Sequence, residues 1–142
     1  IMLYIIIMEL KFNIAIVGSG LTGSITSLAL AKAGYKVALI DPKSFDEFLE
    51  NNYDTRTTAL SKKSKLFFEH LNLWQAMKPF TCMIKNIMVN DGNPQKNIYF
   101  KKPQSKKNIP LGFMIRNKDL FTLLIDEINK NKNINKYDNK VN

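Results

Sequence analysis

The chain has 142 residues and a mass of 16.3 kDa, which is enough for one domain with a buried core and too little for two full domains. Hydrophobic residues make up 45% of it and charged residues 23%, a globular composition that excludes disordered, collagen-like and coiled-coil chains. The net charge of +9 would suit nucleic acid or an anionic membrane, but only Arg56 and Arg116 are arginines, and Asn and Ile are also heavily used. Drift toward A/T-rich codons explains this excess of lysine better than a selected basic surface does, which disfavours a nucleic-acid partner.

The apolar start, residues 1–7, is too short to span a bilayer and lacks the charged beginning and cleavage site of a signal peptide. We interpret it as an artefact of start-site choice upstream of Met8; a short anchor that touches the membrane is the alternative. The single cysteine, Cys82, excludes an internal disulfide and a cysteine zinc cluster, and predicts a reducing, cytoplasmic environment.

A βαβ unit is predicted next. The β-branched run 11–17 predicts a buried parallel strand, residues 21–33 predict a helix ended by a left-handed Gly34, and residues 35–40 predict a second strand. The expected buried face of the helix comprises Ile25, Leu28, Ala29 and Ala33. This order predicts an α/β fold of the Rossmann type with a right-handed crossover.

The middle of the chain contains both predicted helices and predicted strands. After an acidic, partly helical stretch at 44–53 and a polar stretch at 54–61, an amphipathic helix carries Leu66, Phe67, His70 and Leu71. We expect Asn72 to end that helix in the left-handed conformation. Strands at 84–89 and 97–100, joined through Asp91-Gly92, predict a β excursion over about residues 82–110.

The last third is predicted to contain a basic loop at 101–108, a strand at 111–115 and an amphipathic helix at 119–128. The apolar face of this helix comprises Leu120, Leu123, Leu124 and Ile128. Residues 129–142 are a Lys/Asn-rich tail with little to bury.

The strongest chemical signal is a complete G-x-G-x-x-G motif between the first predicted strand and helix. It comprises Gly18, Ser19, Gly20, Leu21, Thr22 and Gly23. The first glycine suits a tight turn, the second a close approach of a pyrophosphate, and the third close helix–strand packing. Asp41, after the second strand, suits the adenosine ribose hydroxyls and disfavours a 2′-phosphate, which leaves FAD and NAD as ligands.

These residues closely resemble the flavin-dependent aromatic hydroxylases of ubiquinone biosynthesis, within the p-hydroxybenzoate hydroxylase superfamily. The resemblance rests on the glycine motif, on Asp41-Pro42 and above all on residues 56–61 (RTTALS). It continues through the segments LNLW at 71–74, VNDG at 89–92 and LGFMIRNKDL at 111–120, and so covers about residues 11–128.

The resemblance implies that FAD is the cofactor and that residues 8–128 are the N-terminal part of an FAD-binding monooxygenase domain, truncated within the start of an antiparallel substrate-domain sheet. It also implies that Arg56 holds oxygens on the AMP-pyrophosphate side of FAD; an ordinary exposed arginine is the alternative. Lys118 stands where relatives often have an arginine near the ribityl chain. It keeps the positive charge but lacks the forked guanidinium group of arginine.

The implied activity is ring hydroxylation of a polyprenylated phenol in ubiquinone biosynthesis, with NAD(P)H as transient electron donor and the protein in the cytoplasm or peripheral on the inner membrane, where a ubiquinone-pathway complex is a further partner. The family's later flavin-contacting Gly-Asp stretch does not occur in this sequence, so we expect an N-terminal fragment. An inactive remnant, the nucleotide-binding half of a split enzyme whose C-terminal half is a separate partner, and a basic nucleic-acid or membrane module are the alternatives.

No residue of this sequence is predicted to be catalytic or to bind a metal. His70, the single histidine, is assigned a structural or surface role because it lies on a helix face beside apolar residues. Cys82 has no histidine or helix start near it in the sequence, so a reactive thiolate is not expected.

Overall fold

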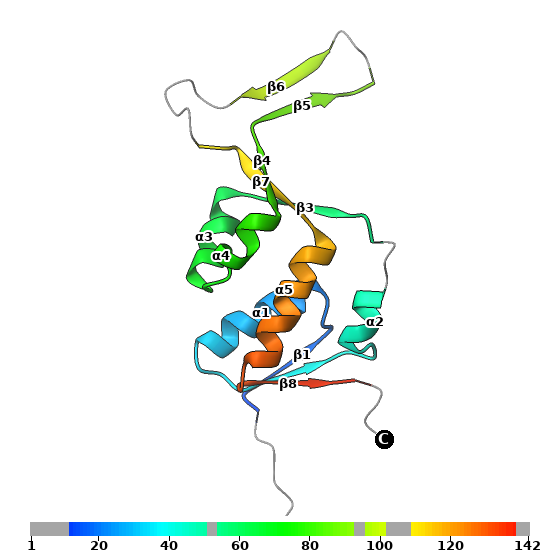
Figure 1. Cartoon of the computed structure of the whole chain (residues 1–142), viewed down its shortest axis with the longest axis vertical. Helices are drawn as coiled ribbons and strands as arrows, with labels where there is room; N and C mark the ends of the chain where they lie inside the picture. The colour runs from blue at the N-terminus through cyan, green and yellow to red at the C-terminus, as the bar shows by residue number, and fades with distance from the viewer. Residues whose placement is uncertain (1–11, 51–53, 93–95, 102–108, 139–142) are drawn as a thin grey trace, which may run out of the picture. The chain divides into compact units, whose positions relative to one another are not determined.

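The computed structural model describes residues 12–50, 54–92, 96–101 and 109–138. The chain divides into two compact units, one from Ile1–Phe48 with Ile125–Asn142 and the other from Leu49–Leu124 (Figure 1). The predicted artefact at residues 1–7 and most of the predicted basic loop at 101–108 lie outside the described residues.

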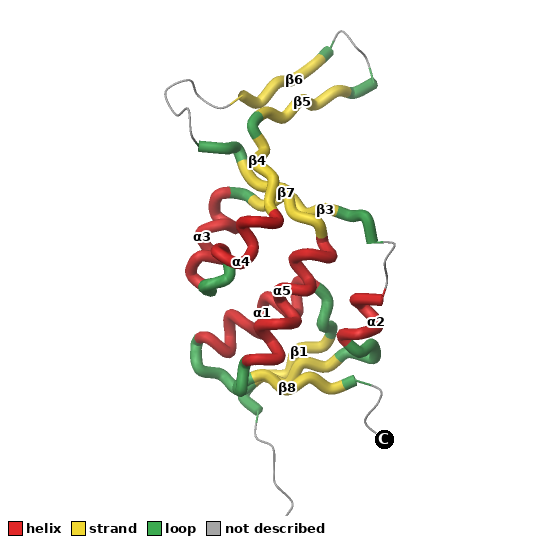
Figure 2. Tube along the Cα trace, viewed as in Figure 1, coloured by secondary structure: helices red, strands yellow, loops and turns green. Residues whose placement is uncertain are grey.

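The first unit is built on a parallel sheet in the order β1-β2-β8, and α1 packs against it (Figure 2). Its main elements are β1 Ile14–Val17, α1 Leu21–Lys32, β2 Val37–Ile40 and β8 Ile134–Tyr137, and the short α2 Phe45–Glu50 follows β2. In the central strand Val37, Ala38 and Leu39 are all buried, because a strand covered on both faces needs a continuous apolar run. The predicted βαβ order is therefore confirmed.

The buried face of α1 differs from the prediction. Leu28 is buried as expected, but Ser24, Ser27 and Ala31 are the other buried positions, and Ala33 is exposed. The two serine hydroxyls are accommodated because each donates to a backbone carbonyl, Ser24 to Ser19 and Ser27 to Ser24, both at 2.8 Å. Gly34 follows the helix with a φ of +93°, as predicted.

Strand β8 shows that the expectation of a tail with little to bury was wrong. Residues 134–137 pair in parallel with β2, with Ile134 opposite Val37 and Tyr137 opposite Ile40. The prediction failed because the strand alternates one apolar residue with polar ones, a pattern that Lys/Asn-rich sequence conceals, and because its pairing partner is distant in the sequence. Ile134 is only 8% exposed.

The second unit contains an antiparallel sheet in the order β3-β7-β4 and a separate hairpin of β5 and β6. Its elements are β3 Thr57–Leu60, α3 Lys62–His70, α4 Trp74–Met77, the 3-10 helix η1 Lys78–Phe80, β4 Thr81–Ile84, β5 Asn86–Asn90, β6 Asn97–Lys101 and β7 Gly112–Arg116. Helix α5, Asn117–Lys130, begins in this unit and ends in the first. The mixed α/β class is confirmed, and β5 and β6 pair as the two strands predicted near 84–89 and 97–100, whereas β3 lies in a stretch expected to be merely polar.

The apolar side chains predicted to pack from α3 are buried only in part. Leu66 and Phe67 are 52% and 43% exposed and His70 is exposed, while Phe68 is buried at 3%. The core forms instead around Phe68, Leu73, Trp74 and Met77, because the chain reverses at Asn72, whose φ of 63° is the predicted left-handed conformation. Asn72 thus lets α4 fold back on α3.

Helix α5 is longer than predicted, and the side chains predicted for its apolar face are buried or half-buried. Leu120, Leu124 and Ile128 are buried, joined by Phe121 and Ile125, and Leu123 is half-buried. In the described part of the chain no helix is long and apolar enough to cross a membrane.

We expect Ile134→Ala to destabilise the first unit, because it removes a buried side chain that packs on the central strand. The free energy of unfolding, measured by urea titration with far-UV circular dichroism, should fall by about 2–5 kcal/mol. Asn135→Ala, at an exposed position of the same strand, is the matched control and should stay within about 0.5 kcal/mol of the parent chain. Equal midpoints for the two variants would contradict the assignment of β8 to the core.

Candidate cofactor site at the glycine turn

The glycine turn, residues 18–23, connects the end of β1 to the start of α1. Gly18 has a φ of +100°, a conformation that side chains other than glycine rarely adopt, and its amide donates to the Ile40 carbonyl at 2.7 Å. The turn is therefore attached to the end of the neighbouring strand β2, immediately before Asp41.

Gly23 is required by close packing. A Cβ built on Gly23 would lie 1.8 Å from the carbonyl oxygen of Gly18, so no side chain fits between α1 and the turn. Around the ideal Cβ positions of Gly18 and Gly20, by contrast, there is open space within 4 Å. The glycines thus bring the helix close to the strand on one side and leave the backbone approachable on the other.

The N-terminus of α1 carries no capping group. Gly20 is the N-cap residue, with no side-chain hydrogen bond, and the first turn contains no acidic residue. Because the first amides of a helix have no intrahelical acceptor and carry a partial positive charge, Leu21 and Thr22 begin a helix end that attracts anions. This end suits a phosphate.

Asp41 closes the site from the end of β2. It is 8% exposed, and its Oδ2 accepts a hydrogen bond of 2.6 Å from the Ser19 amide while its Oδ1 accepts one of 2.9 Å from the Lys43 amide. Each carboxylate oxygen can accept a second hydrogen bond, so Asp41 retains capacity for ligand hydroxyls.

The charge of Asp41 is favoured in this setting. Burial by itself would raise the pKa of Asp41, but the amides of Ser19 and Lys43, the Ser19 side chain and the charge of Lys136 together lower it. Lys136, on β8, donates to the Lys43 carbonyl at 2.8 Å. Burial lowers the pKa of Lys136, against the opposing effect of Asp41.

Ser19 bears an unsatisfied group beside this carboxylate. Its side chain is fully buried; its Oγ lies close enough to the Asp41 carboxylate to help lower the pKa of Asp41, but it makes no well-formed hydrogen bond to any described residue. A buried hydroxyl without a well-formed hydrogen bond is unfavourable, so the Ser19 Oγ fits a site that a polar ligand completes. The cradle without Cβ atoms, the uncapped helix end and this hydroxyl all fit the adenosine–pyrophosphate part of a dinucleotide.

The structure thus brings seven of the nine predicted site residues together in the first unit, namely Gly18, Ser19, Gly20, Leu21, Thr22, Gly23 and Asp41. Arg56 and Lys118 belong to the second unit, where the Asn117 amide donates to the Arg56 carbonyl at 3.0 Å. Arg56 is 79% exposed and forms a two-point ion pair with Asp54, with its Nε and Nη2 donating at 2.7 and 2.8 Å. Arg56 lowers the pKa of Asp54 to about 2 through these hydrogen bonds.

Sequence reasoning missed two residues of the first-unit site. Ser24 holds the Ser19 carbonyl, and its signal was available, since a small polar residue directly after the third glycine can reach back into the turn. Lys136 had no such signal, because its approach to Asp41 depends on β8.

Similarity to known proteins extends over most of the chain. No protein-family model matches the sequence. The ubiquinone hydroxylase UbiL of Rhodospirillum rubrum is 25% identical over 118 residues, which are 83% of this chain and 27% of UbiL.

Two solved structures have the same fold. The p-nitrophenol 4-monooxygenase PnpA of Pseudomonas putida DLL-E4 matches with a TM-score of 0.68 and 16% identity, over 89% of this chain and 31% of that one. PqsL of Pseudomonas aeruginosa, described as a "probable FAD-dependent monooxygenase", matches with a TM-score of 0.65 and 13% identity, over 88% and 32%. The predicted resemblance to FAD-dependent monooxygenases is confirmed, and the chain spans about a third or less of the length of these proteins.

The lowered pKa of Asp41 predicts how stability changes with pH. Because the folded chain binds this proton less tightly than the unfolded chain, the ionised group contributes stability above its unfolded pKa of about 3.9, and that contribution is lost as the pH falls through the lower folded value. The difference in unfolding free energy between the parent chain and Asp41→Asn should be constant between about pH 6 and 8 and should shrink below about pH 4. Urea titrations at each pH measure it; a difference that grows on acidification would contradict the assignment.

Proposed function

We propose that this chain supplies the adenosine–pyrophosphate part of the FAD site of a monooxygenase that hydroxylates a polyprenylated phenol in ubiquinone biosynthesis. The single observation that carries the proposal is the glycine turn, in which an uncapped helix end, an open glycine cradle and the Asp41 carboxylate meet. The similarity to UbiL supports the ubiquinone substrate, and the match to PqsL supports FAD.

Each residue of the turn has a distinct task in this proposal. The amides at the start of α1, from Leu21 and Thr22, bind the pyrophosphate oxygens, where the helix end offsets their charge. Asp41 accepts the ribose hydroxyls, and the Ser19 hydroxyl gains a well-formed hydrogen bond. Ser24 and Gly23 hold the turn in place through the Ser19 carbonyl and through close packing.

Arg56 is proposed to contact the same cofactor on its AMP-pyrophosphate side. A guanidinium has five N–H donors, of which the Asp54 carboxylate uses two, so the Nη1 group and one further N–H remain for a phosphate or ribose oxygen. Asp54 fixes the direction of the fork. Lys118 is proposed to lie near the ribityl chain, as a cation without the fork.

Bound FAD supplies the redox chemistry, accepting electrons from a nicotinamide nucleotide and transferring one oxygen atom of O2 to the phenolic ring. The part of this chain is to bind and orient the cofactor. The ring chemistry and the phenol substrate are assigned to the whole protein, of which this chain is the nucleotide-binding portion, and the C-terminal portion of a split enzyme is a proposed partner.

The β5–β6 hairpin supports the assignment to a larger enzyme. In its register Ile87 faces Phe100 and Val89 faces Ile98, which puts four apolar side chains on one face, and they are between 42% and 62% exposed. The opposite face carries the pair Met88 and Tyr99, at 60% and 56% exposed, so the hairpin presents more apolar surface to solvent than an isolated stable hairpin would. We propose that the substrate-domain portion of the enzyme covers the first of these faces.

The proposed recognition of the adenosine half predicts that the purified chain binds FAD and not FMN, since FMN has no adenosine ribose or pyrophosphate. Asp41→Ala should weaken FAD binding by about 1.5–3 kcal/mol, the range for a hydrogen bond to a charged group, or about tenfold or more. Quenching of flavin fluorescence on titration measures both.

Asp126→Ala is the matched control, because Asp126 is an exposed carboxylate of the same unit outside the turn, and it should bind FAD as the parent chain does. If the chain binds FAD and FMN equally, or if Asp41→Ala binds FAD as tightly as the control, the proposed role of the turn is wrong.

Arg56→Ala should also weaken FAD binding, by about tenfold, and Arg56→Lys should restore less than half of that free energy, because an ammonium cannot form two parallel hydrogen bonds. Arg116→Ala is matched to it, since Arg116 is 72% exposed and forms a similar two-point pair with Asp119. Equal losses for the two arginine variants would indicate a general charge effect and would exclude a specific role of Arg56.

A further inference from the structure

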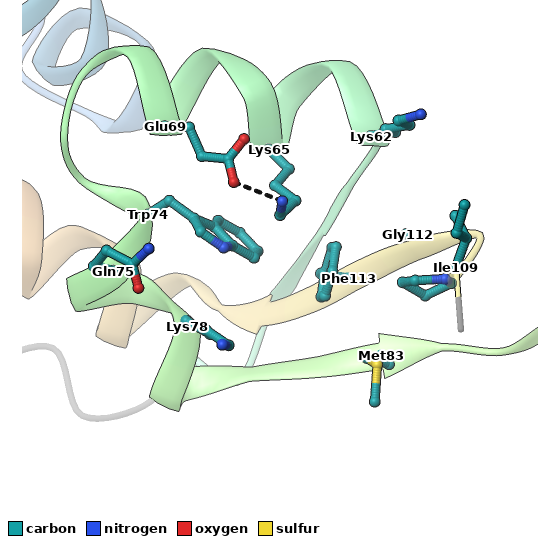
Figure 3. Close-up of a pocket in the computed structure, with 11 residues that line it drawn as sticks. Lys62, Lys65, Glu69, Trp74, Gln75, Lys78, Met83, Ile109, Gly112 and Phe113 are labelled. Atoms are coloured by element: carbon teal, nitrogen blue, oxygen red, sulfur yellow. Dashed lines mark hydrogen bonds and ion pairs between the residues drawn. The ribbon is translucent and has the colours of Figure 1, made fainter.

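A groove in the second unit has no part in the proposed FAD site. It has a volume of about 460 Å³, within the range of small-molecule sites, and lies between α3, α4 and the strands β4 and β7 (Figure 3). All of its lining residues belong to the second unit, whereas the glycine turn belongs to the first.

The groove has an aromatic floor. Trp74 is 3% exposed, and its ring meets that of Phe113 edge to face with centroids 4.8 Å apart. Met83 and Ile109 line the same groove although they are 55% and 45% exposed. Exposed apolar side chains beside a rigid aromatic pair form a surface that gains stability when a flat apolar ligand covers it.

The charges around the floor are unbalanced. Lys62, Lys65 and Lys78 line the groove together with one carboxylate, Glu69. Lys65 pairs with Glu69 at 2.6 Å and lies 5.4 Å from the centre of the Trp74 ring, so these two charges offset each other.

Lys62 and Lys78, at opposite ends of the groove in Figure 3, form no ion pair with any described residue. Two unpaired ammonium groups beside an apolar floor favour an anion attached to an apolar body over a neutral ligand of the same shape, and they repel a cation.

We propose that this groove is a second binding site, and that it takes a small aromatic carboxylate. The arene covers the floor at Phe113, Met83 and Ile109, and the carboxylate lies within reach of the Lys62 or Lys78 ammonium. The site is independent of the glycine turn, so the proposal stands whether or not the chain binds FAD.

Trp74 provides a direct readout, because it is the single tryptophan of the chain and forms the floor of the groove. Titration with 4-iodobenzoate at low ionic strength should quench tryptophan fluorescence to saturation, since the iodine atom is a heavy-atom quencher. The neutral isostere 4-iodobenzamide should bind several-fold more weakly, and added salt should reduce the difference.

The double variant K62A/K78A should lose about fivefold in affinity for 4-iodobenzoate and should bind the amide as the parent chain does, because exposed charge interactions are individually small. The control is K63A/K36A, which removes the same charge from two exposed lysines outside the groove, one of them on α3. Isothermal titration calorimetry gives the dissociation constants independently of quenching.

Three results would overturn the proposal: no saturable quenching by 4-iodobenzoate, equal affinity for the amide, or equal loss in the two double variants. The first two are measured on the parent chain and do not depend on how any variant folds. Failure of FAD binding, measured separately, would leave this outcome unaffected.

Discussion

The hydrogen bond from the Ser19 amide to the Asp41 carboxylate joins the carboxyl ends of the two neighbouring parallel strands of the βαβ unit. It connects the turn after β1 to the end of β2 at 2.6 Å, beside the bond from the Gly18 amide to the Ile40 carbonyl. The position of α1 depends on this junction, because Gly23 packs against the Gly18 carbonyl and Ser24 holds the Ser19 carbonyl. A buried carboxylate is tolerated there because amides and the Lys136 charge stabilise its ionised form.

The same junction couples folding to ligand binding. A carboxylate that already organises the turn meets a ligand in its final geometry, so little ordering remains to oppose binding. Ser19 acts in the opposite sense, because its buried hydroxyl makes no well-formed hydrogen bond to a described residue and a ligand can provide one. Ser19 thus contributes to the fold through its backbone amide, while its side chain is available to a ligand. The site is organised in this way at a cost in stability.

Features that depend on residues close together in the sequence could be predicted from it. The glycine motif, the carboxylate after the second strand, the left-handed Asn72 and the face of α5 all follow from conformational preference or periodicity. Strands β3 and β8 escaped prediction because their identity comes from distant partners, β7 and β2. The buried face of α1 differed from the prediction because Ser24 and Ser27 are satisfied by backbone carbonyls. On α3, Leu66 and Phe67 stay exposed while Phe68 is buried with Leu73 and Trp74. Both outcomes are tertiary effects.

The position of β8 beside β2 also has a kinetic consequence. Val37 pairs with Ile134, so the sheet of the first unit closes only after the segment that forms the second unit has been synthesised. Non-local pairing of parallel strands is slow because the loop must close before its contacts form. During synthesis on a ribosome, the edge of β2 that pairs with β8 therefore stays unpaired until residues 134–137 emerge, and an unpaired strand edge is a site of aggregation.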